Sequence, residues 1–176
     1  MKTSEERFEQ AFQIADTARK NVIEFLSNVT QEKSQIRPDV DQWSIGEIAH
    51  HLILVEKRFR NLILKIVTED QQESFLIDEV LSKRSFELED AVDATKIGKG
   101  RAPEVLLPLE GLKITKLTVQ LVALREETRS QLANLRTTNL DNFWWKHPKL
   151  GPLTLYELIR YMGYHETRHL AQMKQK

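Results

Sequence analysis

A chain of 176 residues, of which 40% are hydrophobic and 30% charged, fits one globular domain that is large enough to bury a core. Its 26 basic and 26 acidic side chains balance, so the charge excess typical of proteins that bind nucleic acid or an anionic membrane is missing. The lack of cysteine excludes disulfides, thiolate zinc sites and a cysteine nucleophile, so any metal must be bound by imidazole or carboxylate groups and any thiol must come from a substrate.

The first predicted helix runs from about Ser4, its expected N-cap, to Asn28, with apolar residues at intervals of three and four. Residues 1–7 (MKTSEER) lack the apolar core of a signal peptide. No apolar run in the chain approaches the roughly 18 residues that span a bilayer. We therefore expect a soluble, cytoplasmic protein. With only 6 glycines and 5 prolines, long helices are favoured over a barrel or a sandwich.

The second predicted helix begins after Ser44, its expected N-cap, and continues to about Val67. Glu47, three residues after Ser44, completes a capping box. His51 flanks the inner apolar stripe of this helix. His50 is rotated from that stripe by about 100° and is expected to have a structural role.

A long connection, 68–111, separates this helix from a third, which we expect from Leu112 to Leu135. Connections between the helices of a bundle are usually much shorter. A crossover of this length allows the second and third helices to lie parallel or apart. Segments of this kind often frame a pocket, so these residues are expected to influence the choice of substrate.

The fourth predicted helix begins at Thr154, where Glu157 makes a second capping box, and runs to the last few residues. Together the four segments predict an all-α fold. We expect a four-helix bundle formed by a single domain, 1–176, with the long crossover between helices two and three.

Two histidines on the fourth helix have the spacing of metal ligands. His165 and His169 stand four residues apart, which places their Cβ atoms about 5–6 Å from each other on one helix face. This spacing also arises by chance, and the simpler interpretation is a pair of surface histidines. Both residues, however, are in phase with Leu158 and Met162 on the apolar stripe. Imidazoles that face a core need hydrogen-bond partners or a metal, and His51 on helix two offers a third ring.

Other polar and aromatic residues stand near these histidines, and each has a simpler structural explanation. Glu47 is a weak candidate for accepting the second ring proton of His51, but capping already explains it. Glu166 and Arg168 are expected to form solvated pairs with helix neighbours. The remaining candidates for pocket or packing roles are Trp43, Trp144, Trp145, Tyr161, Tyr164 and the loop residue His147.

Three stretches of the chain together resemble the DinB-like superfamily, the DNA-damage-inducible four-helix bundles. Residues 43–52 (WSIGEIAHHL) resemble its first signature, in which the metal-binding histidine follows the tryptophan by eight positions, here at His51. Residues 147–154 (HPKLGPLT) and 165–172 (HETRHLAQ) resemble the second and third signatures. Within the group the chain is similar to the YfiT-like members, including bacillithiol S-transferases and metal-dependent hydrolase relatives, and more remotely to mycothiol-dependent maleylpyruvate isomerases.

The resemblance implies a nickel or zinc ion held by His51, His165 and His169, and often a homodimer. Zinc, nickel and iron all suit imidazole ligands, so the residues themselves do not choose the metal. Three protein ligands leave at least one coordination position open, as in catalytic sites.

We therefore expect a metal-dependent transferase that adds a low-molecular-weight thiol to an electrophilic small molecule. The alternatives are a metal-dependent hydrolase that uses metal-bound hydroxide, and a stress-linked bundle whose metal is structural or vestigial. No nucleic-acid or membrane partner is expected.

Overall fold

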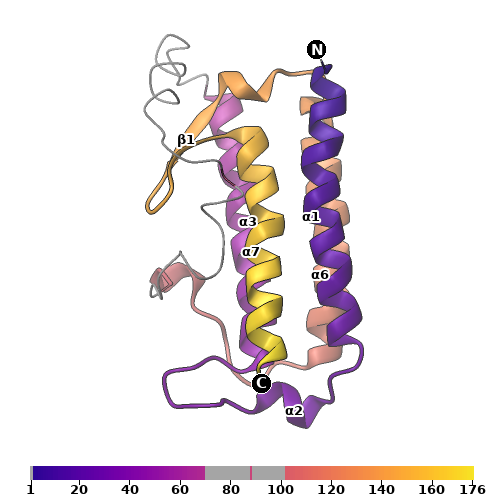
Figure 1. Cartoon of the computed structure of the whole chain (residues 1–176), viewed down its shortest axis with the longest axis vertical. Helices are drawn as coiled ribbons and strands as arrows, with labels where there is room; N and C mark the ends of the chain where they lie inside the picture. Colours follow the sequence, from indigo (N-terminus) through magenta and orange to yellow (C-terminus); the bar gives the residue numbers. More distant parts are fainter. Residues whose placement is uncertain (1, 70–87, 89–101) are drawn as a thin grey trace.

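The structure is a computed structural model that describes residues 2–69, 88 and 102–176. The described chain is mostly helical, with one small two-stranded sheet. Four long helices lie side by side (Figure 1): α1 (Ser4–Leu26), α3 (Ile45–Thr68), α6 (Ile114–Leu132) and α7 (Leu155–Lys174). The shorter elements are α2 (Gln31–Gln35), η2 (Glu104–Leu106), η3 (Ala133–Leu135), η4 (Leu140–Asn142), β1 (Trp144–His147) and β2 (Gly151–Thr154).

The four predicted helices are present, close to their expected bounds. The predicted capping boxes are confirmed at Ser44 and Thr154, each of which accepts a backbone N–H through its side chain. At the first helix the expectation was one residue late. The N-cap is Thr3, whose hydroxyl accepts the Glu6 N–H while the Glu6 carboxylate accepts the Thr3 N–H. Most of the predicted crossover, 70–87 and 89–101, lies outside the described residues.

The long helices pack on one another through two clusters of buried apolar side chains, and each of the four helices contributes to both clusters. Helix α1 lies against α7 and α6, and α3 lies against α6 and α7. Figure 1 shows α1 beside α6 on one side and α3 beside α7 on the other. This arrangement places the second and fourth of the predicted helices in contact, which is the condition for a site shared by His51 and the histidines of α7.

The prediction of a purely α-helical chain needs one correction, because β1 and β2 form an antiparallel hairpin directly before α7. Trp144 pairs with Thr154 and His147 with Gly151. Gly151 has φ 73°, in the left-handed region where glycine has no steric penalty. Each strand has four residues, too few for an alternating apolar pattern to be recognised, and Pro152 is itself a signal against a strand. Trp144, Trp145 and His147 are therefore strand residues, not loop residues.

A buried cluster of charges ties the four long helices together, and it contradicts the expectation that Glu166 is solvated. Each helix contributes one member, and all four residues are at most 5% exposed: Arg19, Glu56, Arg125 and Glu166. Both arginines bridge both carboxylates, for example Arg19 to Glu166 at 2.8 Å and Arg125 to Glu56 at 2.9 Å. The charges of this quartet balance, as burial requires.

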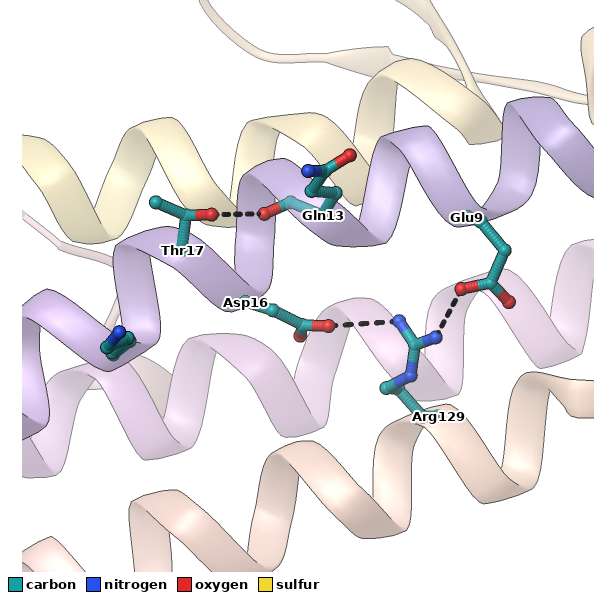
Figure 2. Close-up of a pocket in the computed structure, with 6 residues that line it drawn as sticks. Glu9, Gln13, Asp16, Thr17 and Arg129 are labelled. Carbon is teal, nitrogen blue, oxygen red and sulfur yellow. Dashed lines mark hydrogen bonds and ion pairs between the residues drawn. The ribbon is translucent and has the colours of Figure 1, made fainter.

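The quartet reaches the surface between α1 and α6. Arg125 also donates to Asp16 at 3.1 Å, and the other carboxylate oxygen of Asp16 accepts from Arg129 at 3.0 Å. Figure 2 shows Arg129 held between Asp16 and Glu9 in a surface hollow on this side of the molecule. The hollow is lined by residues of α1 and α6 only and includes none of the histidines.

None of the described helices is both long enough and apolar enough to cross a membrane.

Candidate metal centre

Helices α3 and α7 bring three buried histidines together. His51 projects from α3, and His165 and His169 project from α7. All three residues are buried, with exposed fractions of 4%, 8% and 4%. One nitrogen from each ring lies within 4.8 Å of the other two. The ring centroids are 5.4 Å apart between His51 and His165, 5.1 Å between His51 and His169, and 4.5 Å between His165 and His169. Among the described residues, no carboxylate joins these three imidazoles in the candidate metal-binding group.

The spacing of the nitrogens fits a single cation. The Nε2 atoms of His165 and His169 are 3.2 Å apart. Two nitrogens bound tetrahedrally to one ion at 2.0–2.1 Å lie about 3.3–3.4 Å from each other. The two side chains therefore stand close to the separation that two ligands of one ion need.

Hydrogen bonds on the outer side of two rings set their tautomers. The Nδ1 of His51 donates to the Leu106 carbonyl at 2.9 Å, and the Nδ1 of His169 donates to the Gln172 side-chain oxygen at 2.9 Å. With the proton on Nδ1, the Nε2 of each neutral ring carries an electron pair instead of a proton, and that of His169 accepts a hydrogen bond from Arg168 at 3.2 Å. This is the usual arrangement of a histidine that binds a metal through one nitrogen and is held in orientation through the other.

The surroundings keep the three rings neutral. Burial is the largest cause in each case. It lowers the pKa of His169 to about 3 with the help of the Arg168 charge, and it lowers the pKa of His165 well below its usual value. Burial also lowers the pKa of His51, partly offset by the hydrogen bond to Leu106. Neutral imidazole is the metal-binding form, so at pH 7 no proton has to be displaced before a cation binds.

Aromatic residues wall the cluster. Trp43 packs on His51 with 4.8 Å between ring centroids, and Tyr161 packs on His165 at 5.9 Å. Tyr161 is buried, and its ring also packs on that of His147, with 4.9 Å between the centroids. Trp145, two residues before His147 on β1, packs on both His147 and Phe59 and is only partly buried.

His147 lies beside the cluster and is not a member of it. Its Nδ1 accepts the backbone N–H groups of Lys149 and Leu150 at 3.2 and 3.1 Å. Burial, with a smaller contribution from the Lys149 charge, lowers the pKa of His147 to about 4. This histidine therefore closes the β1–β2 turn as a neutral acceptor.

The hydrogen bonds of Glu47 go to groups other than His51. Its carboxylate accepts the Ser44 N–H at 2.9 Å and the guanidinium of Arg37. Burial alone would raise the pKa of Glu47, but the bonds from Arg37 and Ser44 outweigh it and lower the pKa. The second nitrogen of His51 is held by the Leu106 carbonyl, so the suggested pairing of Glu47 with His51 is absent from the geometry.

His50, the neighbour of His51 on α3, has the structural role expected from its position. Its Nδ1 accepts the Leu109 N–H at 2.9 Å. Together with the bond from His51 to Leu106, this contact fastens residues 106–109 along α3 at the edge of the site.

Three groups at the site were missed by sequence reasoning: Leu106, Gln172 and Arg168. Leu106 acts through its backbone carbonyl, which every residue has, so no sequence signal marks it. Gln172 follows His169 by three positions, a spacing that brings side chains together on a helix and could have revealed it. Arg168 was expected to pair with a helix neighbour, but its Nη2 lies 3.2 Å from the Nε2 of His169.

Comparison with known proteins yields a family and a relative. A family model described as the DinB superfamily matches residues 14–173, which include all three histidines of the cluster. The uncharacterized protein YuaE of Bacillus subtilis strain 168 is 28% identical over 163 residues, covering 92% of this chain and 94% of that protein.

Proposed function

This chain belongs to the DinB superfamily, and from that premise we propose that it is a metal-dependent enzyme whose cation is held by His51, His165 and His169. The observation that carries the proposal is the convergence of three buried, neutral imidazoles, with one nitrogen of each ring within 4.8 Å of the other two. Apolar packing alone does not call for three imidazoles whose nitrogens lie this close together, whereas a shared cation does.

We propose more specifically that the enzyme transfers a low-molecular-weight thiol to an electrophilic small molecule. A divalent cation, nickel or zinc, would supply Lewis acidity that makes a coordinated thiol more acidic. Because the three protein ligands are neutral, they would leave the full charge of the cation available. The chain has no cysteine, so the sulfur must come from a substrate.

The residues of the chain have distinct roles in this proposal. Leu106 and Gln172 hold two of the imidazoles in register, and Trp43 and Tyr161 exclude bulk water from the rings. In the transfer, the thiol would lose its proton to solvent and its sulfur would form a bond to the electrophilic carbon. The bond from that carbon to the leaving group would break, and the leaving group would depart as an anion with the bonding electron pair.

The test is a thiol-conjugation assay with 1-chloro-2,4-dinitrobenzene. Protein loaded with nickel or zinc is compared with the chelated form, using cysteine, glutathione and bacillithiol in turn. We expect a rate that rises with metal occupancy for at least one thiol, and a loss of that rate when all three histidines are replaced by alanine. His50→Gln is the matched control, because glutamine can still accept the Leu109 N–H.

Two outcomes would replace this proposal. If no thiol reacts faster than in the chelated control, and an activated ester is hydrolysed in a chelator-sensitive way, the protein is a hydrolase. If metal is bound and neither reaction occurs, the metal has a structural role.

A further inference from the structure

Arg168 is the one cationic side chain in contact with the three-histidine cluster among the described residues. It is partly buried on α7, and its Nη2 lies 3.2 Å from the Nε2 of His169, the same nitrogen that faces His165. Its positive charge contributes to lowering the pKa of all three rings. The guanidinium therefore lies beside the nitrogens that would face a bound cation.

No carboxylate within the described part of the chain pairs with Arg168. The buried arginines of the quartet behave differently, since Arg19 and Arg125 each contact both Glu56 and Glu166. The metal-binding group, too, contains no carboxylate among the described residues. A divalent cation next to three neutral imidazoles and one guanidinium would give the site a net charge of about +3, which attracts and retains anions.

We propose that Arg168 binds an oxyanionic group of the substrate that occupies the open coordination position. The thiols used by this enzyme would then be anionic, because they carry that group. The planar guanidinium presents paired N–H donors that match a carboxylate or a phosphate. Its distance from His169 places those donors beside the metal-directed nitrogens, so one small molecule can contact both the cation and the arginine. This inference rests on the proposed function, because it assumes a bound metal.

The test measures thiol binding by isothermal titration calorimetry on the metal-loaded full-length protein, with metal content determined on the same samples. The probes are mercaptoacetate, which carries a carboxylate, thiophosphate, and the neutral 2-mercaptoethanol. The variants are Arg168→Gln, Arg168→Lys and, as a control for net charge on the same helix, Lys174→Gln, whose side chain is exposed.

For the wild type we expect at least one anionic thiol to bind about tenfold or more tightly than 2-mercaptoethanol. The anion that shows this preference identifies the group as carboxylate or phosphate. Arg168→Gln should abolish the preference while the affinity for 2-mercaptoethanol stays within about twofold, and Arg168→Lys should restore it in part. Lys174→Gln should behave like the wild type.

An equal affinity for neutral and anionic thiols, or a preference that survives in Arg168→Gln, overturns the role of Arg168. A wild-type protein without stoichiometric metal overturns the proposed function itself. The metal analysis therefore separates the two failures.

Discussion

At the scale of single residues, the site depends on groups that orient the imidazoles as much as on the imidazoles. The Nδ1–H of His169 is held by Gln172, one helical turn further along α7. Partners of this kind typically change metal affinity by about 10–100-fold when they are removed.

Gln172→Leu should therefore weaken the binding of zinc by about 10–100-fold, because His169 can then rotate or adopt the other tautomer. The dissociation constant is measured by competition with a chromogenic chelator. Gln120→Leu, at an exposed position of α6, serves as the control for the loss of a glutamine amide. An unchanged dissociation constant in Gln172→Leu would show that this hydrogen bond does not position the ring.

The sequence was informative about residues of a rare type that fall on the apolar stripe of a predicted helix. His51, His165 and His169 could be selected because imidazoles on an apolar stripe require an explanation. The orientation of Arg168 toward His169 could not be predicted, because adjacent positions on a helix ordinarily do not face each other. The quartet did leave a signal that was overlooked: Arg125 follows Leu121 by four positions and so lies on the apolar stripe of α6.

At the scale of helices, α1 and α7 approach each other at a glycine. A Cβ added to Gly163 would lie 2.9 Å from the Cα of Ala15 and 2.9 Å from the carbonyl oxygen of Ile14. Both atoms belong to the backbone of α1, so neither can rotate away, and the two helices would have to separate.

Gly163→Ala should therefore destabilise the protein by about 1–3 kcal/mol, although alanine is the better helix former by about 1 kcal/mol. The free energy of unfolding is measured with urea. Ala123→Gly, at an exposed position of α6, gives the opposite comparison and should lose about 1 kcal/mol. A Gly163→Ala protein as stable as the wild type would contradict the close packing of α1 on α7.

The charged quartet is the second device that fixes the helices relative to one another. Glu166→Gln leaves the buried guanidinium groups of Arg19 and Arg125 with one carboxylate too few, and it should cost about 3–5 kcal/mol. Urea unfolding checks this value, with Glu126→Gln on the exposed face of α6 as the control. A loss below about 1 kcal/mol, the range of exposed ion pairs, would mean that the quartet is solvated.

The long helices were predictable because their apolar period extends over many turns and their starts carry capping boxes. The β1–β2 hairpin was not, because it depends on pairing between two strands of four residues each and on the fit of Trp145 against Phe59. Such contacts are properties of the folded chain and leave no local pattern.

For the whole molecule, the histidines couple stability to pH. Burial lowers the pKa of His169 to about 3 and that of His147 to about 4, and it lowers those of His51 and His165 as well. The unfolded chain, with histidine pKa values near 6.5, then binds more protons than the folded chain below that pH. The stabilisation is therefore complete above about pH 6.5 and is lost as the pH falls toward 4.

For metal-free protein, we expect the free energy of unfolding to be nearly constant from pH 8 to 7 and to fall between pH 6.5 and 5. Each proton taken up only on unfolding contributes about 1.4 kcal/mol per pH unit. Carboxylates with lowered pKa values, such as Glu56, reduce the free energy of unfolding only below about pH 4.5. The pH range of the histidine effect is therefore separate from that of the carboxylates. Urea titrations in the presence of a chelator measure the profile, and a flat profile between pH 7.5 and 5 would contradict the buried, neutral state of the rings.

The central claim is that imidazoles from α3 and α7 hold one cation, and elemental analysis tests it most directly. Metal content per chain is measured by mass spectrometry on freshly purified protein and after reconstitution with nickel or zinc. The variant in which His51, His165 and His169 are all alanine is measured in parallel, with circular dichroism to verify that it is folded. The account predicts about one ion per chain in the wild type and essentially none in the variant. A wild type that stays metal-free after reconstitution, or a folded variant that keeps its ion, would contradict it.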